Sequence, residues 1–211
     1  MGRWPSVSRR GRVLRPLKQT VLILGEGRET EPNYFRQLRL EPTVSRHFAV
    51  TVKKGPGFSP KAVVEAAIAD LKGASFRGKR YDEVWCVLDF EGQQNLQSLD
   101  EARALARRAG ITICVSHPSF EVWFLAHFAR IARAFRDSDD VLAYLAKFWR
   151  KHCGNEYRKN AEDNYDRIAK RTGEGIKNAR WVREVHHKMQ KDIAHCNSAT
   201  EVYLLVEHLL S

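Results

Sequence analysis

Acidic side chains stand directly after two apolar runs of the sequence, at the points where strands would end. Glu26 comes two residues after the run 20–24, and Asp89 comes directly after the run 84–88. Because the ligand crevice of an open α/β sheet lies at the carboxyl ends of its strands, we expect both side chains to point into one crevice. Clustered carboxylates repel one another unless a cation lies between them. The spacing therefore predicts a divalent-cation site.

Further carboxylates lie close to these two in the sequence. Glu31 is five residues beyond Glu26, and Glu91 is two residues beyond Asp89. Mg²⁺ is held by one or two carboxylates plus water and substrate phosphate, so all four are candidate ligands of Mg²⁺ or Mn²⁺. Two such ions would activate a water and stabilise the leaving oxygen of a phosphodiester. Alternatively, acids at strand ends cap helix N-termini, which applies most to Glu29 and Glu31.

A separate carboxylate, Glu121, lies in the strongly apolar segment 120–128. A helix with this composition is largely buried, and a buried carboxylate requires a partner. A metal ion and an arginine of the C-terminal helical region remain equally open as that partner. His127 in the same segment is predicted to be a hydrogen-bonded core residue and not a ligand.

The elements that must position these side chains alternate between strands and helices over the first 130 residues. Strands are predicted at 20–24, 48–52, 84–88 and 111–115, and helices at 31–40, 62–71, 96–109, 118–128, 140–151, 156–171, 176–191 and 200–210. Thr30 is the predicted N-cap of the first helix. Repeated β-α units imply an α/β fold with a parallel sheet flanked by helices. We expect a basic arm at 1–18, an α/β core at 19–135, and a helical annex packed on that core at 136–211.

The composition excludes several classes of protein. With 43% hydrophobic and 29% charged residues, the chain is expected to be globular. It has no apolar run long enough to span a membrane and no signal peptide, so we expect a cytoplasmic protein without membrane contact. The four cysteines form no CxxC pair, which argues against a zinc ribbon. The sequence also lacks a P-loop, a complete dinucleotide fingerprint and a GxSxG elbow.

The net charge of +11 is concentrated at two places. Residues 1–18 hold six basic residues and no acid, and residues 147–191 hold thirteen basic and six acidic residues. Such regions suit a polyanionic partner, because each phosphate contact releases counterions. A solvated tail that only aids solubility is an equally good interpretation of the arm. The candidate nucleic-acid contacts are Arg9, Arg10, Arg12, Arg28, Arg158 and Lys159.

Five short motifs resemble those of RloB-like proteins, in the order and approximate spacing of that family. They are residues 22–35 (LILGEGRETEPNYF), 89–91 (DFE), 117–123 with His127 (HPSFEVW and H), 157–160 (YRKN) and 197–200 (NSAT). The resemblance implies a Toprim-like fold related to OLD-family nucleases. It also implies Mg²⁺ binding by Glu26 and by Asp89 with Glu91, where the family more often has a second aspartate. Finally, it implies a role in phage defence beside a separately encoded AAA-type ATPase.

The residues and the resemblance together favour a metal-dependent nuclease acting on DNA or RNA, transfer RNA included. Glu26, Asp89 and Glu91 would hold the metal, with Glu26 also a candidate general base. Glu121 would be an auxiliary metal ligand or would orient the site, and Lys159 would neutralise charge on the scissile phosphate. The alternatives are a non-catalytic nucleic-acid-binding or sensor subunit, and a phosphotransfer or nucleotidyl-transfer enzyme. The sequence leaves the oligomeric state open, a homo-oligomer included.

Overall fold

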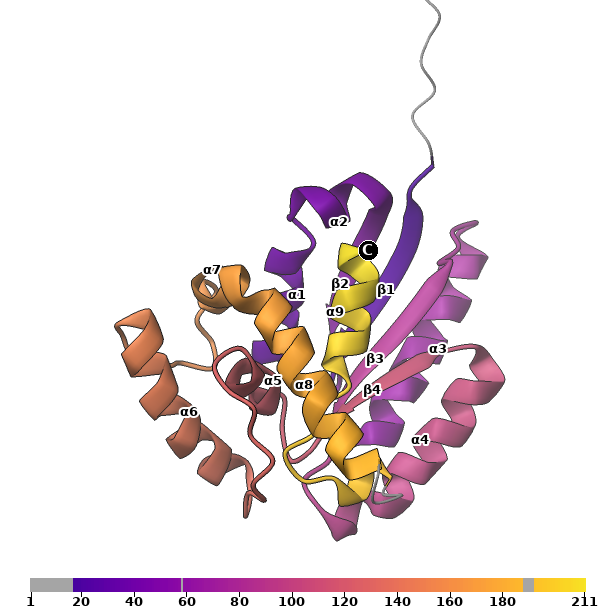
Figure 1. Ribbon diagram of the computed structural model, residues 1–211. Helices are drawn as coiled ribbons and strands as arrows, with labels where there is room; N and C mark the ends of the chain where they lie inside the picture. The colour runs from indigo at the N-terminus through magenta and orange to yellow at the C-terminus, as the bar shows by residue number, and fades with distance from the viewer. Residues whose placement is uncertain (1–16, 58, 188–191) are drawn as a thin grey trace, which may run out of the picture.

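The computed structural model describes residues 17–57, 59–187 and 192–211 (Figure 1). Its sheet has four strands in the order β2-β1-β3-β4, and every neighbouring pair is parallel. The strands are β1 (Gln19–Gly25), β2 (Phe48–Lys54), β3 (Glu83–Asp89) and β4 (Thr112–Ser116). The predicted α/β fold with a parallel sheet is therefore confirmed. All four carboxyl ends meet at one edge of the sheet.

Helices connect the strands and then continue to the C-terminus. The α-helices are α1 (Thr30–Leu38), α2 (Pro42–His47), α3 (Pro60–Phe76), α4 (Leu96–Ala109), α5 (Glu121–Ala126), α6 (Ser138–Cys153), α7 (Asn164–Ile168), α8 (Thr172–His187) and α9 (Val202–Leu210). Short 3₁₀ turns lie at Gln93–Asn95, Ala169–Arg171 and Ile193–His195. No helix in the described part of the chain is both long and apolar enough to cross a membrane.

The sheet is buried on both faces, as the aliphatic character of its strands requires. Val21 and Ile23 of β1 are buried on one face, and Leu22 and Leu24 are buried on the other. Helices α3 and α4 pack over the face of Leu22 and Leu24. Helices α1, α5 and α9 lie on the opposite face (Figure 1). Because helices cover both faces of the sheet, polar side chains can gather only at the ends of its strands.

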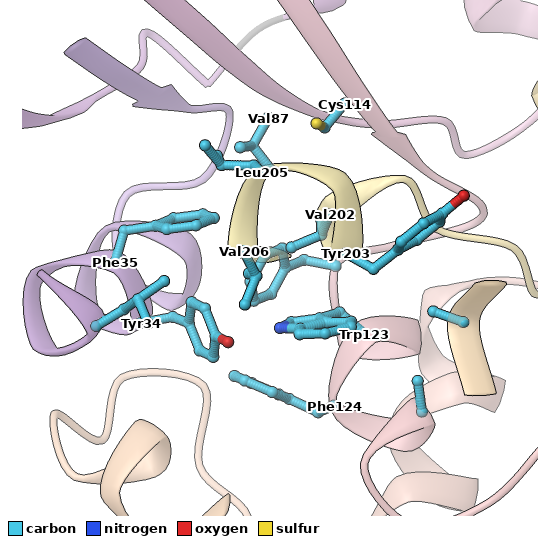
Figure 2. Packing of buried hydrophobic residues seen from close by; sticks show 14 of the residues in the cluster. Tyr34, Phe35, Val87, Cys114, Trp123, Phe124, Val202, Tyr203, Leu205 and Val206 are labelled. Carbon is cyan, nitrogen blue, oxygen red and sulfur yellow. The ribbon is translucent and has the colours of Figure 1, made fainter. Parts of the chain in front are cut away.

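Helix α9 fills the space between the sheet and the helices on its second face. Figure 2 shows Leu205 beside Val87 of β3, and Val206 directed toward Trp123 and Tyr34. All five side chains are at most 1% exposed. The C-terminal helix thus completes the same hydrophobic core that covers the sheet.

The segment before α9 also extends the sheet at its β4 edge. His117 and Ala199 are joined by a backbone hydrogen bond of 2.9 Å, and Glu201 donates its backbone N–H to Val115 at 2.8 Å. The Ser116 and Thr200 hydroxyls lie 2.8 Å apart and are buried. These contacts fix the carboxyl end of β4 and therefore the start of α5.

The largest difference from the predicted elements is the segment 154–163, which is not helical. A helix was expected over 156–171, but only α7 and a short 3₁₀ turn form there. Gly154 adopts a left-handed conformation with φ of 75° and ends α6. Beyond it, contacts of Tyr157 and Lys159 with α1 and α5 hold the chain in an irregular conformation. Tertiary contacts here override a sequence that has good helix propensity.

Smaller differences concern helix boundaries. The predicted helix 118–128 shortens to α5, and α2 was not predicted. Thr30 is wrong as an N-cap, because it is the first helical residue and its hydroxyl donates to the Lys159 carbonyl oxygen at 3.4 Å. The predicted helix 176–191 begins earlier, at α8, and its residues 188–191 lie outside the described residues.

Candidate acidic site at the carboxyl edge of the sheet

Strand pairing brings Glu26 and Asp89 together. Gly25 pairs with Val87 in the β1–β3 register, and the next backbone N–H, that of Glu26, donates to the Val87 carbonyl oxygen at 2.9 Å. In return, the backbone N–H of Asp89 donates to Oε2 of Glu26 at 3.0 Å. The two acids are far apart in sequence, and the parallel sheet places them at one point.

Two glycines allow Glu31 to fold back over the end of β1. The backbone N–H of Gly27 donates to Oε1 of Glu31 at 2.8 Å. A Cβ on Gly27 would clash with the Glu31 carboxylate, and a Cβ on Gly25 would lie 2.8 Å from Glu31 Cβ. Glu31 is only 3% exposed. Its carboxylate therefore both anchors the turn before α1 and lies among the other acids.

Glu121 begins α5 and has three partners from the protein. The Ser119 hydroxyl donates to Oε2 at 2.8 Å, and the Tyr157 hydroxyl donates to Oε1 at 3.2 Å. Lys159 Nζ lies 3.6 Å from Oε1. Glu121 is 2% exposed, so these contacts answer the sequence-based question of what partners a buried carboxylate. The basic partner is a lysine and not the expected arginine, and two hydroxyls accompany it.

The irregular segment 154–163 holds Lys159 over this edge of the sheet. Its attachment to α1 uses Thr30, as described above, and Asn33, whose Nδ2 donates to the Asn160 carbonyl oxygen at 3.4 Å. At its other end, Asn164 Nδ2 donates to the Arg158 carbonyl oxygen at 2.8 Å. Backbone carbonyls are thereby satisfied without a helix.

The acids border one cavity of about 290 Å³. Its lining includes Glu31, Asp89, Glu121 and Lys159, and Glu26 lies next to it through its hydrogen bond with Asp89. The remaining lining residues are Gly27, Arg28, Glu29, Thr30, Phe120 and Asn160. Within the described residues, Oδ1 of Asp89 is buried and has no hydrogen-bond partner. A buried carboxylate oxygen without a donor is costly unless a ligand or cation reaches it.

Burial and mutual repulsion raise the pKa values of these acids. Burial, followed by the charges of Glu31, Glu121, Glu26 and Glu91, raises the pKa of Asp89 well above its ordinary value. Burial also raises the pKa of Glu26 to about 7, although the Asp89 N–H opposes the rise. Burial raises the pKa of Glu31 as well. The site therefore favours either protons or a cation among its carboxylates.

The donor set fits a hard divalent cation. Carboxylate oxygens are the ligands of Mg²⁺, and the unpartnered Oδ1 of Asp89 is the atom that such an ion would satisfy. Asp89 and Glu31 would hold the ion, with Glu26 beside them. In the described part of the chain, no three acidic, histidine or cysteine side chains already converge in ligand geometry. Because Mg²⁺ usually retains several waters, one or two carboxylates suffice to hold it.

Other predicted site residues lie outside this cavity. Glu91 is exposed and does not line it, although its charge reaches Glu26 and Asp89. Arg158 lines a different hollow of about 380 Å³, together with Asn155, Glu156 and Arg167. The predicted nucleic-acid contacts Arg9, Arg10 and Arg12 lie outside the described residues.

Three side chains of the site were not predicted to take part in it. Ser119, Tyr157 and Thr30 contact Glu121 or the segment that carries Lys159. All three lie within the motifs shared with the family, but nothing in their residue types alone indicates a partner. His127 is 1% exposed, its Nδ1 lies 2.9 Å from the Trp123 carbonyl oxygen, and burial lowers its pKa to about 4. The core role predicted for this histidine is confirmed.

The fold and this cavity define an α/β protein with an acidic site at the carboxyl edge of a parallel sheet. Within that class the chain belongs to the RloB-like family, whose model matches residues 21–209. The resemblance drawn from the sequence motifs is thus confirmed over nearly the whole chain. No curated protein and no solved structure matches the sequence significantly.

Proposed function

We propose that the protein is a metal-dependent phosphodiesterase that cuts nucleic acid. The observation that carries this proposal is the cavity in which buried carboxylates with raised pKa values surround the unpartnered Oδ1 of Asp89. Lys159 stands at the same cavity. Carboxylates that hold a divalent ion next to a cation for phosphate are the parts that phosphodiester hydrolysis needs.

Each residue of the site has a proposed role in this reaction. Asp89 and Glu31 would hold Mg²⁺ or Mn²⁺, which supplies Lewis acidity toward the phosphate when bound. Glu26 would accept the proton of the attacking water, because a pKa of about 7 suits a general base at neutral pH. Lys159 would neutralise the charge that develops on the scissile phosphate. Glu121 orients this lysine at 3.6 Å.

Asp89→Asn is the direct test of the proposed reaction. The variant keeps the shape of the side chain and removes the charge that would bind the metal. With Mg²⁺ or Mn²⁺, we expect wild type to cleave end-labelled plasmid DNA or total transfer RNA and the variant to lose that activity. Asp166→Asn, an exposed position on α7, is the matched control and should cleave like wild type. A folded Asp89→Asn protein with full activity would refute the proposal.

A second candidate function is a binding or sensor subunit without catalysis. It is favoured by the absence of a preformed three-ligand group in the described residues. It predicts nucleic-acid binding that is steeply salt-dependent and unaffected by Mg²⁺. If neither wild type nor Asp89→Asn cleaves nucleic acid in the assay, and such binding is observed, the results would favour this candidate.

We also propose that the protein acts in the cytoplasm in phage defence, with a separately encoded AAA-type ATPase. Support for this setting comes from membership of the RloB-like family and what the resemblance implies. If the ATPase controls the cavity, adding it with ATP should raise the rate of cleavage by wild type. A rate that is the same with and without the ATPase would argue against this partnership.

A further inference from the structure

A second charged surface lies at the amino edge of the sheet, opposite the acidic cavity. The segment from the end of α3 to the start of β3 contains Lys72, Arg77, Lys79 and Arg80 and no acidic residue between them. Except for Arg77, these cations also border a hollow of about 480 Å³. We call Lys72, Lys79 and Arg80, with the hollow that they line, the amino-edge patch. The charge analysis of the sequence had not singled it out.

The cations of the amino-edge patch are available to a ligand. Lys72, Lys79 and Arg80 are exposed, and none has an ion-pair partner among residues 17–57, 59–187 and 192–211. The nearest acid in sequence, Asp82, is already engaged: its Oδ2 accepts hydrogen bonds from the backbone N–H and the hydroxyl of Thr20, at 2.7 and 2.8 Å. Asp82 also lines the hollow, so three cations lie beside one carboxylate there and the patch keeps a net positive charge.

Aromatic side chains accompany these cations. Tyr81 lines the hollow, and Phe76, the last residue of α3, is 93% exposed. A large apolar side chain that is almost fully exposed beside cations is a platform on which a base can stack. Surfaces that bind single-stranded nucleic acid typically combine cations, which contact its phosphates, with aromatic rings, which stack on its bases.

The N-terminal arm enters the fold at this same edge. β1 begins at Gln19, next to the start of β3, because Val21 pairs with Glu83 (Figure 1). The arm 1–18 contributes six positive charges by sequence, and the segment 72–80 contributes four more. The positive charge of both segments favours a polyanionic partner.

We propose that the amino-edge patch binds the backbone of a single-stranded nucleic acid, at a site separate from the acidic cavity. Lys72, Lys79 and Arg80 contact phosphates, and Phe76 and Tyr81 stack on bases. The two sites lie at opposite ends of β3, whose seven residues span about 20 Å. A strand that keeps the stacked rise of B-DNA, about 3.4 Å per phosphate, needs about six nucleotides to reach from one to the other.

Salt dependence of binding tests the patch without requiring catalysis. The assay uses fluorescence anisotropy of a labelled single strand of about 30 nucleotides in EDTA. The triple variant Lys72→Gln, Lys79→Gln, Arg80→Gln should reduce the slope of log K against log salt by about 2, since each phosphate contact contributes about 0.7. The control, Arg46→Gln, Arg107→Gln, Arg108→Gln, changes three cations that are exposed, have no ion pair among the described residues and lie outside the two basic regions of the sequence.

The control should keep the wild-type slope. An unchanged slope in the patch variant, or an equal reduction in the control, would overturn the proposal. Vesicles containing phosphatidylserine test the other polyanion that such a surface could bind. Loss of vesicle binding in the patch variant, with nucleic-acid binding intact, would assign the patch to lipid and overturn the proposal as well.

Strand length gives a second readout, which rests on the proposed nuclease function. The patch variant should cut a strand of about 30 nucleotides more slowly than wild type and cut one of about three nucleotides, which is too short to reach both sites, at the same rate. Equal rates on the long strand would contradict the proposal. If wild type cuts neither strand, the nuclease function fails, while the salt slope still decides whether the patch binds nucleic acid.

Discussion

Replacing Glu26 by glutamine should make the metal-free protein more stable at neutral and alkaline pH. In the folded protein, burial raises the pKa of Glu26 to about 7 from an ordinary value of 4.5. The folded state therefore binds a proton at this position more tightly than the unfolded state does. Below pH 4.5 the carboxyl is protonated in both states, so it makes no pH-dependent difference.

The size of the effect follows from the two pKa values. As the pH rises from 4.5 to 7, the unfolded chain releases its proton first, and the folded state loses about 1.4 kcal/mol of stability per pH unit. Above pH 7 the penalty is constant at about 3 kcal/mol. Glutamine cannot ionise, and its side-chain oxygen can still accept the hydrogen bond from the Asp89 N–H. Glu26→Gln therefore removes the penalty and keeps the contact.

Urea unfolding in EDTA at pH 4.5 and pH 8 measures this difference. We expect Glu26→Gln to exceed wild type by about 3 kcal/mol in free energy of unfolding at pH 8, and to match it at pH 4.5. Glu91→Gln is the control, because Glu91 is exposed and its loss should change stability by less than about 0.5 kcal/mol. A Glu26→Gln protein that is less stable than wild type at pH 8, or equally shifted at both pH values, would refute the reasoning.

Two further substitutions test how the site is built. Tyr157→Phe removes a hydroxyl donor from the buried carboxylate of Glu121 and should lower the free energy of unfolding by about 1–3 kcal/mol in urea titrations. Tyr144→Phe is its control, since the Tyr144 hydroxyl makes no hydrogen bond in the described structure, and an equal loss there would contradict the assignment. Gly55→Ala should cost about 1–3 kcal/mol, because its Cβ would clash with the last carbonyl oxygen of β1. Gly173→Ala, in open space in α8, should cost nothing by the same measurement.

The sequence predicts the sheet and its acidic edge well, for a physical reason. A buried parallel strand is a short aliphatic run, and such runs are visible in one sequence. Right-handed β-α-β connections then bring the carboxyl ends of the strands to one edge, whatever the length of the connections. Glu26 and Asp89 follow two of these runs directly. Their contact through the Asp89 N–H therefore follows from the topology.

The surroundings of Lys159 were not predictable in the same way. The stretch 156–163 contains good helix formers, and local propensity favours a helix there. Its conformation depends instead on distant partners, namely Thr30 in α1 and Glu121 in α5. Hydrophobic periodicity carries no information about such contacts. The same limit applies to Thr30, whose type suits an N-cap but whose hydroxyl is used across the fold.

The amino-edge patch was not predicted, because the net charge of a sequence segment does not show which of its charges lie together on the folded surface. Residues 19–146 are nearly neutral in total, so the cations of the segment 72–80 were averaged with acids that lie elsewhere. In the structure several of those acids are already paired, for example Asp70 with Lys53 and Glu101 with Lys61. Local potential depends on which charges remain unpaired on one surface.

The buried carboxylates of the site differ in how many hydrogen-bond donors and cations surround them. Glu121 receives two hydroxyl donors and lies beside an ammonium group, so it is stable in place without any ligand. Glu31 receives the Gly27 N–H. Oδ1 of Asp89 receives no hydrogen bond from any described residue. Burial and the neighbouring acids also raise the pKa of the Asp89 carboxyl. Of these acids, Asp89 therefore gains most from a cation, whereas Glu121 acts through the lysine that it positions.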